Sequence, residues 1–408
     1  MKLTAKEILE RGVEEIIEKK HLKKTLSSKK KLRIKYGIDP TDPRLHLGHG
    51  ACLLKLKAFQ ELGHIPILII GDFTAQIGDA SDKPRARKPL SQKEAQENAR
   101  FYLKEFSKII DLKKAEVYQN SKWLKKLKLQ NFISLASHFT AQQMIQRRNF
   151  KERWERGEAI GVHEILYPIL QGYDSVMVKA DVEIGGFDQL FNLKVGREIQ
   201  KIFGQTPQDI MTLKMLPGPD GKKMSKSEGN AIFLNDPPEQ MYGKIMRIDD
   251  SLVLPYFELC TFYPIKKALK MIQEAKEAKI NFKEIKSILA QEIVSLFWNK
   301  REAQRAREYF ERIFKEKKLP EKIPSFELKA GEYSILDILI KSGQIFSKSE
   351  AKRLISQGGV KIYLKDGKAR VIKDWHEKIK LENEIVARIG KRKFVRFLCQ
   401  DSYQKRAN

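Results

Sequence analysis

Two histidines three residues apart precede an apolar helical pattern near the start of the chain. The segment GIDPTDPRLHLGHG, residues 37–50, contains His46 and His49, with Gly48 between them. The free N–H groups at a helix start bind anions, and side chains at spacing i, i+3 share a face. The pattern therefore predicts histidine contacts to phosphate oxygens, with Gly48 leaving room for a ligand ring. Two capping residues on a surface helix are the alternative, and a zinc site would need a third ligand that the sequence does not supply.

A second candidate phosphate-binding segment lies much later in the chain. The segment DGKKMSKSEGN, residues 220–230, places Lys223 and Lys226 beside small hydroxyl residues in a loop bounded by glycines. Such a loop can move, so its two ammonium groups can close on an anion. In a chain this rich in lysine, a solvated basic loop is the alternative.

Composition narrows the class of protein and its partners. The 408 residues are 41% hydrophobic, enough for a sizeable core, and carry a formal net charge of +27. This excess predicts an anionic partner, either nucleic acid or a membrane surface. The three cysteines form no CxxC pair, and the N-terminus lacks the apolar core of a signal peptide. We expect a soluble cytoplasmic protein that does not enter a membrane.

Hydrophobic patterning predicts a βαβ unit around the two histidines. A strand at 31–38, a helix at 46–63 and an aliphatic strand at 65–72 follow one another. Further strands are expected at 115–119, 180–186 and 210–216. An aliphatic strand without polar alternation is typical of a parallel sheet covered on both faces. The expected fold class is therefore α/β, with a doubly wound, Rossmann-like parallel sheet whose ligands bind at the carboxyl ends of the strands.

The chain divides into segments with different patterns. We predict a Rossmann-like α/β domain over 1–235, interrupted by a helical insertion at about 121–179. Lys-rich helical periodicity continues over 236–320, and prolines then mark a linker at 321–332. A small α+β domain is expected over 333–408.

The C-terminal segment is strongly basic. Residues 347–397 contain 15 Lys or Arg against 6 Asp or Glu. Lys348, Lys352 and Arg353 lie in a predicted helix that a short basic β-region follows. This arrangement suits a phosphate backbone, so these three side chains are candidate RNA contacts, with a solvated surface as the alternative.

Together these motifs resemble a known family. HLGHG is similar to the HIGH signature of class I aminoacyl-tRNA synthetases, and KMSKS is their second signature, in the expected order. The segments YPILQGYDSV and GGFDQLFN resemble the amino-acid site of the bacterial tyrosyl-tRNA synthetases. The C-terminal segment resembles an RNA-binding fold shared with a small-subunit ribosomal protein, and 236–320 corresponds to the family's anticodon-arm-binding domain.

The resemblance implies a two-step reaction. Tyrosine is activated by ATP to tyrosyl-adenylate with release of pyrophosphate, and is then transferred to the 3′-terminal adenosine of tRNA(Tyr). ATP is a substrate accompanied by Mg²⁺, with no tightly bound cofactor and no metal ligands in the chain. The family usually forms a homodimer through the insertion. No enzyme nucleophile is required, so catalysis comes from positioning and charge stabilisation.

The resemblance also assigns roles to individual residues. Asp174 would accept the phenol O–H, which would select tyrosine over phenylalanine. The remaining tyrosine contacts would be Tyr167, Gln171, Asp79, Gln189 and Asp39. The catalytic residues would be Thr41, His46, His49, Lys223 and Lys226. The ATP site would comprise His46, Gly48, His49, Cys52, Gly186, Asp188, Lys223 and Lys226. Lys83 and Arg87 are further candidate pyrophosphate ligands.

Two positions depart from the family pattern. Lys35 stands where many members have a tyrosine that contacts the phenol, and Phe187 stands where a small hydroxyl residue is usual. A tryptophanyl enzyme, or an RNA-binding protein on an inactive synthetase scaffold, are the alternatives. The carboxylate at 174 argues against the first, and the intact histidines and lysines argue against the second.

Overall fold

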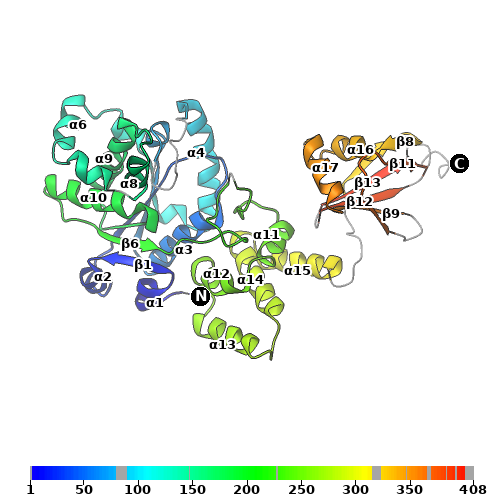
Figure 1. Cartoon of the computed structure of the whole chain (residues 1–408). Helices are drawn as coiled ribbons and strands as arrows, with labels where there is room; N and C mark the ends of the chain where they lie inside the picture. Colours follow the sequence, from blue (N-terminus) through cyan, green and yellow to red (C-terminus); the bar gives the residue numbers. More distant parts are fainter. Residues whose placement is uncertain are drawn as a thin grey trace. The chain divides into compact units, whose positions relative to one another are not determined.

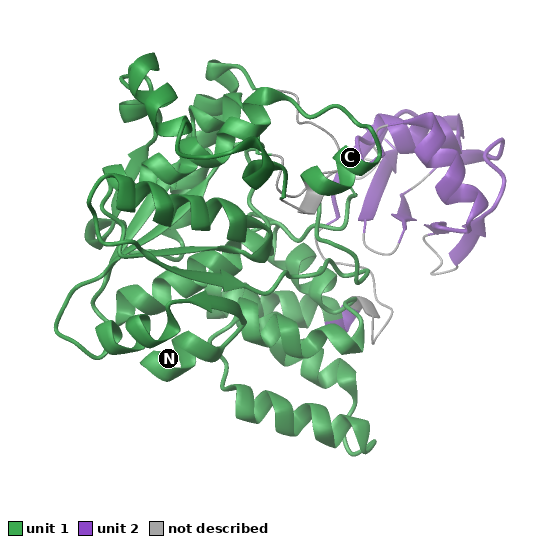
Figure 2. Cartoon of the chain, turned by 60° about the vertical axis from the view of Figure 1, so that its left-hand side comes forward, with its two compact units in different colours: residues 1–310 green, residues 311–408 purple. Residues whose placement is uncertain are grey.

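The computed structural model divides the chain into two compact units, residues 1–310 and 311–408 (Figure 2). It describes residues 2–79, 90–146, 148–226, 228–314, 323–345, 347–364, 369–382, 384–390 and 393–399. Lys83 and Arg87 lie outside these ranges. Within them, every helix is too short or too polar to cross a bilayer.

A six-stranded sheet in the order β1-β6-β5-β2-β3-β4 is the frame of the first unit. Figure 1 shows its edge strand β1 beside β6. Its strands are β1 (Val13–Ile17), β2 (Arg33–Ile38), β3 (Ile65–Ile70), β4 (Glu116–Gln119), β5 (Val182–Gly186) and β6 (Asp209–Leu213). All neighbours are parallel except β1, which pairs antiparallel with β6 at the edge. The predicted doubly wound α/β fold is confirmed. The edge strand was missed because VEEII is short and its two glutamates continue the charged pattern of the N-terminal helix.

Helices cover both faces of this sheet. Along β3, Leu68 and Ile70 join the core formed with α3 (Leu47–Glu61) and α4 (Gln92–Ser107). The alternate residues Ile67 and Ile69 pack on the opposite face against α9 (Val162–Met177), which lies beside α10 (Leu190–Ile202). Double coverage explains why β3 shows no polar alternation.

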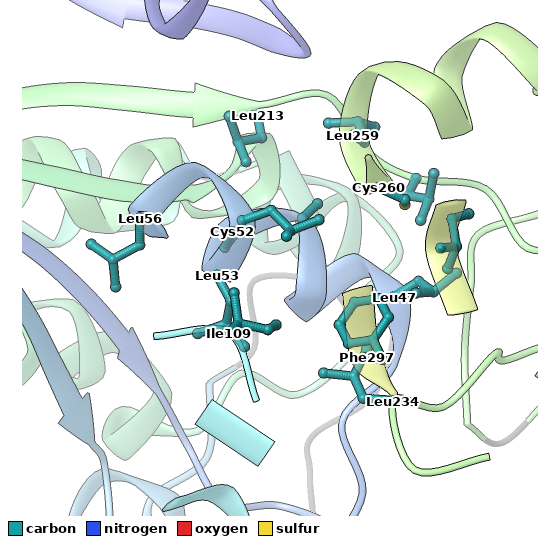
Figure 3. Close-up of a cluster of buried hydrophobic side chains, with 14 of the residues drawn as sticks. Leu47, Cys52, Leu53, Leu56, Ile109, Leu213, Leu234, Leu259, Cys260 and Phe297 are labelled. Carbon is teal, nitrogen blue, oxygen red and sulfur yellow. The ribbon is translucent and has the colours of Figure 1, made fainter. Parts of the chain in front are cut away.

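Helix α3 is the centre of the largest core. Figure 3 shows its side chains between Leu213 of β6, Leu259 and Cys260 of α12 (Val253–Cys260), and Phe297 of α14 (Phe282–Phe297). A Cβ added to Gly50 would lie 3.1 Å from atoms of both Leu234 and Phe297. The second glycine of HLGHG therefore allows close packing of α3 against α14.

The remaining helices of the first unit fall into three groups. The N-terminal pair is α1 (Ala5–Glu10) and α2 (Lys19–Leu26). The insertion consists of α5 (Ser121–Leu124), α6 (Leu129–Ala136), α7 (Ala141–Ile145), α8 (Arg148–Glu155) and α9, so residues 121–179 are mainly helical as predicted. The segment after 236 contains α11 (Pro238–Ile245), α12, α13 (Ile265–Lys276), α14 and α15 (Lys300–Phe314). Short 3₁₀ turns are η1 (Thr74–Gln76), η2 (Leu112–Lys114), η3 (Phe187–Gln189) and η4 (Asp250–Leu252). The border at 235 stays a prediction, because one core extends across it.

The second unit has its own core and two small sheets. A five-stranded sheet runs β10-β9-β12-β13-β7, and β11 pairs with β8. Its elements are β7 (Ser325–Leu328), β8 (Gly331–Ser334), α16 (Ile335–Lys341), α17 (Lys348–Ser356), β9 (Val360–Tyr363), β10 (Ala369–Ile372), β11 (Lys378–Leu381), β12 (Ile385–Ile389) and β13 (Lys393–Cys399). The predicted linker at 321–332 needs correction, because β7 and the start of β8 lie inside it. The flanking prolines concealed β7, whose partner β13 is distant in sequence.

This boundary predicts where the chain can be shortened. A chain ending at residue 314 should keep the thermal midpoint of the first unit, because β7 and its partner β13 are removed together. A chain ending at residue 328 should aggregate more readily, because β7 and Phe326 lose β13. Circular dichroism melting and light scattering measure both effects. A midpoint more than about 3 °C below the full chain's first transition would show that the first unit depends on the second.

Candidate active site

A cavity of about 230 Å³ opens where the strand order reverses, between β5 and β2. Its walls come from the segments that follow the carboxyl ends of the parallel strands, together with the start of α3 and part of α9. This is the usual place for a ligand in a doubly wound sheet. The predicted residues that line it are Asp39, Thr41, His46, Gly48, His49, Cys52, Asp79, Tyr167, Gln171, Asp174, Gly186, Asp188, Gln189 and Lys223.

Of the predicted catalytic and substrate-binding residues within the described ranges, Lys226 does not line this cavity. Its Nζ lies 3.8 Å from Asp42 Oδ1, and its side chain is 20% exposed. Lys223 Nζ lies 3.8 Å from Asp188 Oδ2. The two lysines thus face carboxylates on different segments around the opening.

The two histidines cap α3 reciprocally. The Gly48 N–H donates to His46 Nδ1 (3.2 Å), and the His46 N–H donates to His49 Nδ1 (3.3 Å). Because Nδ1 accepts in both rings, Nε2 is the donor nitrogen of each neutral imidazole. The rings lie 3.9 Å apart between centroids. Both rings therefore cap the helix and present an N–H donor, so the capping and phosphate-binding interpretations are compatible.

Gly48 has a structural reason beyond space for a ligand. A Cβ at this position would lie 2.9 Å from His46 Cε1. A side chain at 48 would therefore displace the ring that caps the helix.

Residues 45–47, at the start of α3, pair with residues 232–234. The second segment follows the loop at 220–230 that contains Lys223 and Lys226, which we call the lysine loop. The Leu47 N–H donates to Ile232 O (2.9 Å), and the Leu234 N–H donates to Leu45 O (2.8 Å). His46 and Phe233 form the antiparallel bridge between them. Backbone hydrogen bonds thus hold the end of the lysine loop next to the start of α3, although the two segments are far apart in sequence.

Asn230 organises the lysine loop from within. Its side-chain amide donates to Asp220 Oδ1 (2.9 Å) and Lys223 O (3.1 Å), and its Oδ1 accepts from the Ser225 N–H (2.8 Å). Asn230 was not predicted from the sequence. An asparagine after Gly229, whose φ of 69° favours glycine, was the available signal of a turn bonded by its side chain.

Asp174 lies at the buried end of the cavity. Trp123 Nε1 donates to its Oδ1 (2.7 Å), and Asn120 Nδ2 donates to its Oδ2 (3.2 Å). Burial raises the pKa of the Asp174 carboxyl to about 6. The charge of Lys35 and these two hydrogen bonds oppose that rise. Asn120 and Trp123 were not predicted from the sequence, because no local pattern shows that they face α9.

Asp39 directly follows β2 and contacts α9. Its Oδ2 accepts from the Tyr167 hydroxyl (2.9 Å), and its Oδ1 accepts from Thr74 Oγ1 (2.7 Å). Burial is the main cause that raises the pKa of the Tyr167 phenol, so this hydroxyl stays a donor.

A chain of amides continues around the cavity. Gln189 Nε2 donates to Asp79 Oδ2 (2.8 Å), and Asn192 Nδ2 donates to the side-chain oxygens of Gln171 (2.9 Å) and Gln189 (3.0 Å). Asn192 was not predicted. It is buried and fixes both glutamines, so polar acceptors and donors converge on this wall.

The two departures from the family pattern have clear positions. Lys35 points toward α9 and donates to Ser175 Oγ (2.7 Å), whereas Tyr36 lies on the opposite face of the sheet, in the core that contains Cys52 of α3. Tyr36 lines the cavity and Lys35 does not. Burial raises the pKa of the Cys52 thiol to about 12, so it stays protonated. Phe187 is 43% exposed on η3, and its neighbours Asp188 and Gln189 still line the cavity.

Comparison with known proteins settles the family. The family model for class I tRNA synthetases (W and Y) matches residues 27–315. The chain belongs to this family. A tyrosine–tRNA ligase from Thermotoga maritima is 45% identical over 390 residues, covering 95% of this chain and 96% of the relative. Tyrosine–tRNA ligase 2 from Clostridium acetobutylicum is 43% identical over 400 residues, covering 96% and 98%.

Solved structures show the same fold. A C-terminally truncated mitochondrial tyrosyl-tRNA synthetase from Aspergillus nidulans has a TM-score of 0.63 at 22% identity, covering 76% of this chain and 93% of that chain. The tryptophanyl-tRNA synthetase of Plasmodium falciparum has a TM-score of 0.57 at 16% identity, covering 76% and 90%. Because the class I synthetase fold is shared by both specificities, the amino acid must be argued from the site.

The predicted RNA contacts lie on one helix of the second unit. Lys348, Lys352 and Arg353 are exposed on α17, and Lys352 Nζ lies 5.6 Å from the centre of the Trp375 ring. The buried side of α17 contributes Ala351 and Ile355 to the core of this unit. The helix is therefore amphipathic, with cations outward.

The side-chain contacts of Asn230 predict how the KMSKS loop of this synthetase behaves. Asn230→Ala should speed hydrogen exchange of the Ser225 amide by roughly fivefold or more, because its acceptor is lost. Asn235→Ala, an exposed asparagine just beyond the loop, is the matched control. Equal exchange rates at Ser225 in both variants and the unchanged protein would contradict the role given to Asn230.

Proposed function

We propose that this chain is a tyrosine–tRNA ligase whose phenol acceptor is Asp174. The observation that supports this proposal is the buried Asp174 carboxylate, which accepts hydrogen bonds from Trp123 and Asn120. The same cavity is lined by His46 and His49 at the start of α3. A phenol O–H fits this acceptor, whereas phenylalanine would leave it without a donor. The 45% and 43% identical relatives are both named tyrosine–tRNA ligases, which argues for tyrosine over tryptophan.

The ammonium and carboxylate groups of the tyrosine substrate would lie toward the side-chain amides of Gln171 and Gln189. Asp79, Asp39 and the Tyr167 hydroxyl supply acceptors for the α-ammonium group. Gln171 and Gln189 are oriented by Asn192 and would bind the same end of the substrate. This pose leaves the carboxylate directed toward the start of α3, where the α-phosphate of ATP would lie.

The nucleotide would lie along the segment that follows β5 and the first turn of α3. Asp188 would accept hydrogen bonds from the ribose hydroxyls, with Gly186, Gly48 and Cys52 beside the nucleoside. The Nε2–H groups of His46 and His49 and the Thr41 hydroxyl would donate to phosphate oxygens.

The proposed chemistry is in-line attack of the tyrosine carboxylate on the α-phosphate, with pyrophosphate as the leaving group. Negative charge grows on the departing phosphates, and Lys223 and Lys226 would approach it as the loop closes. Mg²⁺ would arrive with ATP and neutralise phosphate charge. Among the described residues, no group of three or more His, Cys, Asp or Glu side chains is arranged to hold a metal ion.

Transfer requires the second substrate, tRNA(Tyr), and the charge distribution supports its binding. The outward cations of α17 would contact its phosphate backbone, which supplies affinity without reading sequence. We further propose a homodimer through the insertion, since Leu129 and Ile133 of α6 and Val162 of α9 are 71%, 59% and 70% exposed. A cytoplasmic location fits the three cysteines, all free and buried.

The test of this function is ATP–pyrophosphate exchange with each of the twenty amino acids. Exchange with tyrosine alone is the expected result. Exchange with tryptophan alone would favour the tryptophanyl alternative, and exchange with none would favour an RNA-binding role. Sedimentation measures the dimer in the same preparation.

Asp174→Asn should lower the ratio of kcat/KM for tyrosine over phenylalanine by about tenfold or more. In the unchanged enzyme, the carboxyl protonates as the pH falls through about 6, so KM for tyrosine should rise below that pH. An amide does not titrate, so this acid limb should disappear in the variant. Exchange kinetics between pH 5 and 8 measure both effects, with KM for ATP as the internal control. Retained selectivity would show that the phenol binds elsewhere.

Lys226→Ala should slow single-turnover adenylate formation by about 100-fold, because its cation acts mainly on the transition state. Tyrosine affinity measured without ATP should not change. Lys222→Ala removes the same charge from an exposed position in the same loop and should leave the rate near normal. Equal rates for the two variants would contradict the role given to Lys226.

A further inference from the structure

A buried ion pair lies at the wall of the cavity where the strand order reverses: Glu183 lines the cavity and Lys35 lies behind it. Lys35 on β2 and Glu183 on β5 are registered neighbours across the parallel strands, and Nζ lies 2.8 Å from Oε1. Their side chains are 0% and 2% exposed. Removing two charges from water is costly, so a pair this deeply buried requires full hydrogen bonding.

The pair obtains that hydrogen bonding from α9. Lys35 Nζ donates to Gln171 O (3.0 Å) and Ser175 Oγ (2.7 Å). Glu183 accepts from Ser175 Oγ (3.1 Å) and Gln171 Nε2 (3.4 Å), and also from Gln208 Nε2. The Lys35–Glu183 pair thus joins two central strands to one turn of α9.

That turn carries the substrate-selecting groups. Gln171 and Ser175 lie on either side of Asp174 in the sequence. The contacts that hold these two residues therefore also fix the position of the Asp174 backbone relative to the sheet. A shift of about 1 Å in an acceptor is enough to weaken recognition severely. Yet Lys35 does not line the cavity, so its effect on a ligand is indirect.

We propose that Lys35 is a positioning residue for tyrosine selection: paired with Glu183, its ammonium group fastens the Gln171–Ser175 turn to the sheet and opposes the negative charge of Asp174. This inference rests on the proposed function, in which Asp174 accepts the phenol. Where family members have a tyrosine at this position, that side chain would contact the phenol directly. In this chain, Lys35 would act on the phenol only through α9.

The charges around Asp174 determine the direction of the electrostatic effect. Burial raises its pKa to about 6, and Lys35 is the first of the groups that oppose this rise, ahead of Trp123 and Asn120. Glu183 acts in the raising direction. On its own helix, the neighbouring Tyr167 is held neutral by its raised pKa. Removing the cation should therefore make the carboxyl harder to ionise, and the phenol acceptor should be lost at a higher pH.

The primary test is the double variant Lys35→Met/Glu183→Gln. Lys35→Met alone would leave the Glu183 charge buried and unpaired, whereas the double variant removes both charges together. We expect kcat/KM for tyrosine to fall by about tenfold or more, with KM for ATP unchanged. The acid limb of the tyrosine KM should move to higher pH, and selectivity over phenylalanine should fall.

Lys55→Met is the matched control. Lys55 is a buried lysine on α3 whose Nζ donates to Ile8 O (2.8 Å) and Arg11 O (2.7 Å), and it does not line the cavity. This control should lower the thermal midpoint while leaving the acid limb and the selectivity unchanged. If the double variant also loses only stability, with an unmoved acid limb, the proposal is overturned.

Two further variants keep the outcomes distinguishable. Ser175→Ala keeps both charges and removes one link to α9, so selectivity should fall by about threefold without a shift of the acid limb. If the double variant does not fold, Ser175→Ala tests the positioning role by itself. Unchanged selectivity in Ser175→Ala would then overturn that role. Asp174→Asn separates the two proposals. If it retains selectivity, the phenol assignment fails; if it loses selectivity while the double variant behaves normally, only the role of Lys35 fails.

Discussion

The reversal of strand order between β5 and β2 is the constraint on which the rest of this structure depends. Parallel strands end at the same edge of a sheet, and the connections after β2 and β5 leave in opposite directions, so a gap is left between them. The segments that line the cavity follow these ends or lie next to them. The catalytic unit therefore needs no dedicated binding domain, since its topology provides the cavity.

Polar groups in that gap would be costly if they were not bonded to one another. Asp174, Asp39 and Asp79 each accept hydrogen bonds from side chains on other elements. Such bonds replace lost hydration and also fix the direction of each carboxylate. A substrate then meets hydrogen-bond acceptors that need little rearrangement. An enzyme that works by orienting its substrates requires this kind of preorganisation.

The sequence was sufficient for the features that local pattern encodes. The central strands, α3 and the helical insertion followed from periodicity, and fourteen of the 31 residues that line the cavity followed from the signature motifs and the family resemblance. The missed features all depend on distant partners. Strand β1 needs β6, β7 needs β13, and Asn120 and Trp123 matter only because α9 brings Asp174 to them. Asn230 and Lys35 lie in segments that the sequence singled out, but their hydrogen-bonding partners depend on how the loop and the sheet fold.

The backbone pairing between residues 45–47 and 232–234 has a consequence for biosynthesis. A chain emerging from the ribosome presents the histidine cap long before the segment that must pair with it. Until residue 234 has emerged, Leu45 and Leu47 have no antiparallel neighbour, and the face of α3 at Gly50 lacks Leu234. The wall of the cavity at the start of α3 therefore cannot be completed during early synthesis, so an incomplete chain should lack the site proposed for ATP.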